Sequence, residues 1–155
     1  MAPSTMSPGQ CLEQELRLTE QLLEALQQEE SALMGNDVDL LQSSTQAKSR
    51  LISEFFEAHR RRLAGLTRLG LSADDRSMLQ WLQDHGDEHA HALWDELLRR
   101  LGQARELNRT NGLMINQLSA RNLAAMQVLQ PTSSAALYGP SGQKMTRSTF
   151  GSILT

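Results

Sequence analysis

Residues 87–130 read DEHAHALWDELLRRLGQARELNRTNGLMINQLSARNLAAMQVLQ, a stretch without proline in which apolar side chains recur every three or four residues. Proline ends helices because it lacks a backbone N–H, and this spacing places apolar side chains on one helix face. The stretch therefore predicts one helix about 66 Å long, at about 1.5 Å per residue, that ends before Pro131. Gly102 and Gly112 lie inside it, and one of them is expected to mark a bend or a close contact with a neighbouring helix.

The residues before this stretch predict a hairpin of two shorter helices and then a short third helix. Ser7 and Asp37 are residues that cap helix N-termini, while Gly35 and Asn36 tolerate the left-handed backbone that ends a helix. The hairpin helices span only about 40–46 Å, so we expect the long helix to extend about 20 Å beyond them. On the first helix the acidic residues, Glu13, Glu20, Glu24 and Glu29, are expected on a solvated face.

The composition favours helices throughout the centre of the chain. Among 155 residues there are 27 Leu against 3 Ile and 2 Val, and all four prolines lie near the ends. We therefore expect an all-α fold, an elongated antiparallel helical bundle resembling a coiled coil, with one long C-terminal helix and a flexible tail. The expected division is a flexible N-terminus over 1–7, a helical domain over 8–130 and a flexible tail over 131–155, rich in Ser, Thr, Gly and Pro.

Charge and cysteine content exclude several classes of protein. Residues 107–155 hold four basic residues and no acid, whereas all 18 acids lie before them, a balance that argues against nucleic-acid binding. The single cysteine, Cys11, permits no internal disulfide, and no signal peptide or membrane span is evident. A cytoplasmic protein without a cofactor is expected.

Two groups of residues suggest chemistry. His85, Glu88 and His89 match H-x-x-E-H, in which two histidines on one helix bind Zn²⁺ and the glutamate acts as base. No third ligand on a separate helix is evident, so an ordinary helix junction is the preferred interpretation and a zinc-dependent hydrolase the alternative. Cys11 lies in the first turn of a helix, where the dipole could lower its pKa, but no histidine partner is assignable and a small packed residue is preferred.

The C-terminal half of the chain resembles a known family. Residues 107–115 (LNRTNGLMI), the Gln130-Pro131 pair that ends the long helix, and residues 137–143 (LYGPSGQ) are similar in order and spacing to the FlgN family of flagellar export chaperones. The resemblance implies a small cytosolic helical chaperone and not an enzyme. Such a chaperone holds the hook–filament junction (hook-associated) proteins unpolymerised and delivers them to the flagellar type III export gate.

The resemblance and the long helix together name candidate sites. Asn108, Asn111 and Gly112 match the family's helix motif, and Tyr138 matches the tail tyrosine associated with the export gate. The helix seam beyond Asn108 is expected to bind the C-terminal segment of a client and to stand clear of the hairpin. The predicted client-binding residues are Asn111, Met114, Ile115, Leu118, Asn122, Ala125, Met126 and Leu129.

Two questions stay open at the level of sequence. Asn108, Asn111 and Asn122 lie close to the apolar seam, where a polar residue sets either helix register inside the bundle or recognition of a partner. A homodimer through the same seam is the competing explanation for its apolar surface, and a purely structural coiled-coil subunit is the third function considered.

Overall fold

The structure, a computed structural model, describes residues 6–130 and contains four α-helices. These are α1 (Pro8–Gly35), α2 (Val38–Arg68), α3 (Asp75–His85) and α4 (Glu88–Leu129). No strand occurs among the described residues, so the predicted all-α fold is confirmed. Within the same residues, no helix combines the length and the apolar character needed to cross a membrane.

The helix ends are set by local capping residues. Ser7 and Gln10 form a reciprocal capping box at the start of α1, and the side chain of Asp37 accepts a hydrogen bond from the Leu40 N–H at 3.0 Å. Asn36, which separates α1 from α2, has a left-handed backbone with φ of 52°. Asp87 caps α4 by accepting from the Ala90 N–H at 2.8 Å. These ends agree with the ones that the sequence predicts.

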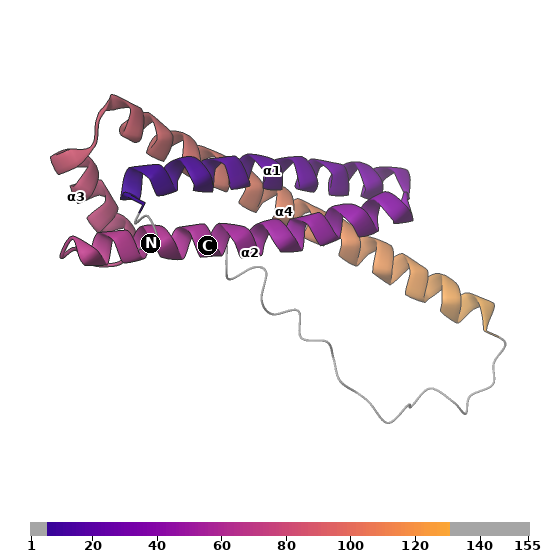
Figure 1. The fold of residues 1–155 in the computed structure, drawn as a ribbon. Coiled ribbons are helices and arrows are strands. Elements are labelled where there is room, and N and C mark those ends of the chain that lie inside the picture. Colours follow the sequence, from indigo (N-terminus) through magenta and orange to yellow (C-terminus); the bar gives the residue numbers. More distant parts are fainter. Residues whose placement is uncertain (1–5, 131–155) are drawn as a thin grey trace, which may run out of the picture.

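The three long helices form an elongated bundle (Figure 1). Helices α1 and α2 make an antiparallel hairpin, and α4 runs in the same direction as α1 but crosses the hairpin at an angle. Helix α4 packs chiefly on α1, and the short α3 closes the end of the bundle where α2 finishes. The core is built mainly of leucines, together with the buried side chains of Phe55, Met78, Trp81 and Trp94.

Helix α4 is much longer than the hairpin that supports it. Its 42 residues span about 63 Å, whereas the 28 residues of α1 span about 42 Å. The last buried residue of α4 is Asn111, and every residue from Ser119 to Gln130 is exposed. The predicted extension beyond the hairpin is therefore present.

The two glycines inside α4 do not allow a neighbouring helix to pack closely against it. Helix α4 continues through Gly102 and Gly112, and a Cβ added at either position would meet no heavy atom within 4 Å. No neighbouring backbone comes close to them, so the expectation of close helix contact is wrong.

Candidate functional site

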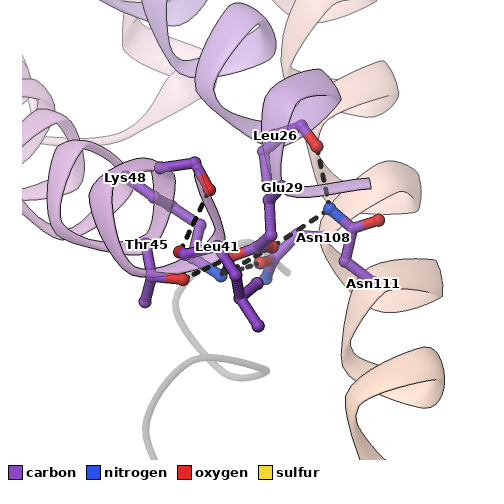
Figure 2. Close-up of polar contacts among 8 residues, drawn as sticks. Leu26, Glu29, Leu41, Thr45, Lys48, Asn108 and Asn111 are labelled. Carbon is purple, nitrogen blue, oxygen red and sulfur yellow. Dashed lines mark hydrogen bonds and ion pairs between the residues drawn. The ribbon is translucent and has the colours of Figure 1, made fainter. Parts of the chain in front are cut away.

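A polar cluster centred on the buried side chains of Glu29, Lys48 and Asn111 joins all three long helices where α4 begins to leave the hairpin (Figure 2). We call it the Glu29 cluster; its members are Glu29 of α1, Thr45 and Lys48 of α2, and Asn108 and Asn111 of α4. The carboxylate of Glu29 is fully buried. It accepts hydrogen bonds from Lys48 Nζ at 3.0 Å and from Thr45 Oγ1 at 3.1 Å. Glu29 is thus satisfied inside the bundle, and its predicted place on a solvated face is wrong.

Both asparagines of the family's helix motif belong to this cluster. Asn111 Nδ2 donates to the Leu26 carbonyl oxygen at 2.9 Å and to Glu29 Oε1 at 3.0 Å, while Lys48 Nζ donates to Asn108 Oδ1 at 3.3 Å. A buried polar group is costly unless it is hydrogen-bonded, so sliding α4 along α1 would break these bonds and leave the groups unsatisfied. Of the two roles left open for Asn108 and Asn111, these contacts inside the bundle favour the setting of helix register.

A second buried ion pair lies nearer the other end of the bundle. Arg62 of α2 donates to Glu15 of α1 through Nε at 2.6 Å and Nη2 at 3.2 Å, and its guanidinium lies 5.1 Å from the centre of the Trp94 ring of α4. The forked geometry and the aromatic face suit a buried arginine. This pair and the Glu29 cluster hold α4 on the hairpin at two levels.

Cys11 lies one turn before Glu15 and is buried. Burial, and then the negative charge of Glu15, raises the pKa of the Cys11 thiol. Burial and the raised pKa oppose activation by the helix dipole and support the preferred interpretation, a small packed residue.

The H-x-x-E-H motif is divided between two helices. His85 is the last residue of α3, Gly86 and Asp87 connect the helices, and Glu88 and His89 begin α4. The zinc-protease motif needs both histidines on one helix face, and this junction does not provide it. His89 Nε2 instead lies 3.3 Å from Glu13 Oε1 of α1. Across residues 6–130, no three His, Cys, Asp or Glu side chains are grouped so as to hold a metal ion.

The residues predicted to bind a client have different surroundings along α4. Asn111 is buried in the Glu29 cluster, and Met114, Ile115 and Leu118 are half-buried. Ile115 and Leu118 lie against the turn between α1 and α2, where they line a groove. The expectation that they stand clear of the hairpin is wrong, because α4 crosses the hairpin obliquely and the turn still reaches them.

After Leu118, every residue of α4 is exposed, although Ser119 and Asn122 still line the edge of this groove. We call residues 119–129 the terminal segment. Its large apolar side chains are 59% exposed for Leu123, 61% for Met126, 84% for Val128 and 80% for Leu129. Its one charged residue is Arg121. Large exposed apolar surface is typical of interaction sites, so this segment is the candidate binding surface.

The terminal segment contains four of the predicted client-binding residues and two exposed apolar residues that were not predicted to bind the client. Asn122, Ala125, Met126 and Leu129 are exposed on it, as are Leu123 and Val128, which lie off the predicted seam. The helix lengths alone predict that α4 ends beyond the hairpin, so every apolar residue on this segment could have been named as a candidate from the sequence. Tyr138 lies outside the described residues.

Comparisons with known proteins give one match. No curated protein and no solved structure matches the chain. The family model described as FlgN protein matches residues 1–146, a range that includes all four helices, the Asn108–Gly112 motif and Tyr138. The chain therefore belongs to the FlgN family, a family of flagellar export chaperones.

Proposed function

We propose that this chain is a cytoplasmic flagellar type III export chaperone whose clients are the hook-associated proteins of the hook–filament junction. It binds their C-terminal segments, prevents their polymerisation in the cytoplasm and delivers them to the export gate. Family membership supports the chaperone class. The observation that carries the binding mode is the terminal segment of α4, which leaves the bundle with its apolar side chains in water.

A helix that is apolar and unsupported can bind another amphipathic helix along its length. Leu123, Met126 and Leu129 are spaced three residues apart, so they form one broad strip of α4, with Met126 and Leu129 on the predicted seam and Leu123 beside it. A client segment that lays leucine or similar side chains on this strip removes both apolar surfaces from water. The same contact covers the client surface that would otherwise pair with further copies of the client.

The route to the export gate is proposed for the residues after α4. Tyr138 lies in the LYGPSGQ sequence that resembles the family's tail motif. A tyrosine ring offers a large contact area with few rotatable bonds, which suits a short recognition motif. Changing Tyr138→Ala should weaken binding to the cytoplasmic domain of the gate and leave client binding unchanged. Equal gate binding by both chains would contradict this assignment.

The client-binding proposal is tested with charged substitutions on the terminal segment. The double variant Leu123→Asp/Met126→Asp changes two exposed side chains, so the fold should be retained, as far-UV circular dichroism will show. We expect it to lose binding to purified junction proteins encoded in the same genome. Leu79→Asp is the matched control, since Leu79 is 50% exposed on α3 at the opposite end of the bundle.

Three results would contradict the proposal. A folded double variant that binds clients as tightly as the unchanged chain places the site elsewhere. An unchanged chain that binds no junction protein removes the proposed clients. A stable oligomer that persists when client is added favours the structural coiled-coil subunit, whereas a homodimer that dissociates on client addition is compatible with a chaperone that covers its own surface.

A further inference from the structure

A groove opens between the α1–α2 turn and α4, where the terminal segment begins, and Ser119 and Asn122 of that segment line it. Its apolar walls come from Leu33, Val38 and Leu41 of the hairpin and from Ile115 and Leu118 of α4. Its volume is about 240 Å³. For comparison, a cavity of about 150 Å³ in another protein accepts benzene, so this groove has room for one large apolar side chain.

The surroundings of the groove carry negative charge. Residues 18–47, which include the whole α1–α2 turn, contain no Lys or Arg. Asp37 lines the groove, Asp39 is exposed in the first turn of α2, and Glu30 is half-buried near the end of α1. On the α4 side, Arg121 is the one charged residue between residues 110 and 130. Glu29 and Lys48 form an ion pair, so neither adds to the net charge here. The remaining charged residues, Asp37, Asp39 and Glu30 against Arg121, give this end of the molecule a negative net charge.

We propose that this groove is the anchor pocket for the client helix: it receives one large apolar side chain, and the client carries Lys or Arg next to that side chain. The inference rests on the proposed function and specifies the partner at the same site. The groove is continuous with the terminal segment, so one helix can occupy both. The acidic residues at the turn attract and orient a client of opposite charge.

A second copy of the chain fits this surface less well than a client helix. An interface of standard size uses about 20–30 residues on each side. The terminal segment has 11 residues, and only the face turned toward the partner would take part. Pairing two terminal segments would also place the acidic turn residues of both copies at the same interface, where their like charges would repel. A basic client helix can contact the groove as well as the strip on the terminal segment, and its Lys or Arg side chains face the acidic residues of the turn.

The test uses the full chain and a purified junction protein from the same genome, with affinity measured by titration calorimetry. Val38→Lys places a charge at the mouth of the groove, at a residue that is 73% exposed and so not needed for the core. We expect it to weaken binding at least tenfold. Asp39→Lys leaves the apolar walls intact and should weaken binding about threefold at low salt, with a smaller dependence of affinity on salt. Leu79→Lys is the matched control and should bind like the unchanged chain.

Each outcome decides one part of the inference. Unchanged client binding by Val38→Lys overturns the anchor pocket. The proposed function is tested separately, by the Leu123→Asp/Met126→Asp variant. Unchanged binding by Asp39→Lys at low salt overturns the basic client. If Val38→Lys converts a dimer of the free chain into a monomer and leaves client binding unaltered, the groove is a self-contact and the inference is wrong. If the unchanged chain binds no junction protein, the proposed function and this inference fail together.

Discussion

Replacing Asn111 by alanine tests whether the Glu29 cluster holds α4 on the hairpin. The change removes two buried hydrogen bonds, one to the neutral Leu26 carbonyl and one to the ionised Glu29. Bonds of these kinds contribute about 1 kcal/mol and about 1.5–3 kcal/mol respectively. Among the residues that the structure describes, no donor reaches Asn111 Oδ1, so alanine also relieves one unsatisfied buried atom. We therefore expect Asn111→Ala to lower the free energy of unfolding by about 2–3 kcal/mol.

The assay is urea unfolding followed by circular dichroism, compared with Asn108→Ala as the matched control. Asn108 accepts one hydrogen bond of 3.3 Å at a half-buried position, and its loss should cost less than about 1 kcal/mol. The comparison requires that both variants keep the slope of the unfolding free energy against urea. An Asn111→Ala variant within about 0.5 kcal/mol of the unchanged chain, or an equal loss in both variants, would refute the role assigned to the cluster.

Three further predictions follow from the described residues. Gly102→Ala should raise the free energy of unfolding by about 1 kcal/mol, measured by urea unfolding, because Gly102 is helical and no atom opposes a Cβ; destabilisation would reveal a hidden contact. Cys11 should react with a thiol reagent much more slowly in the native chain than in urea, since burial raises its pKa; equal rates would contradict the packing. Hydrogen bonds from Arg99 and Arg100 lower the pKa of Glu96 from 4.5 to about 2, so its stabilising contribution is complete above pH 4.5 and is lost as the pH falls toward 2. Glu96→Gln should remove that part of the acid sensitivity of unfolding, and an unchanged pH profile would show that the pair contributes nothing.

The helix boundaries were predictable because they depend on neighbouring residues in the sequence. Ser7, Asp37 and Asp87 each cap a helix through a contact three residues away, and Asn36 adopts the left-handed backbone that the sequence suggests. The length of α4 follows from the Asp87 cap at its start and from the absence of proline before Pro131. Its extension beyond the hairpin could therefore be predicted by comparing helix lengths.

The buried charges were not predicted, although the sequence contains a signal for them. Glu29 bonds to Lys48, 19 residues away, and to Asn111, 82 residues away, and such pairings depend on how the helices pack. A closer reading of α1 finds both buried glutamates at the three- and four-residue intervals of the core positions. Those positions are Leu12, Glu15, Thr19, Leu22, Leu26, Glu29 and Leu33, all buried.

The exact position at which α4 leaves the hairpin also depends on packing. Spacing along α4 places Ile115, Leu118 and Met126 on related faces, but only the first two are half-buried. Their burial comes from the crossing of α4 over the α1–α2 turn, and no periodicity in the sequence gives a crossing angle. The sequence therefore predicted which helix extends from the bundle, but it could not give the exposure of each residue on it, and the client-binding role of these residues stays a prediction.

The central claim is that the terminal segment of α4 binds the client, and hydrogen–deuterium exchange of the full chain measures this directly. Amides of residues 119–129 should exchange rapidly in the free chain and become protected when a purified junction protein is added, while amides beside the Glu29 cluster exchange slowly in both states. Protection confined to α1, α2 or α3, or no new protection in a chain that has bound its client, would contradict the account.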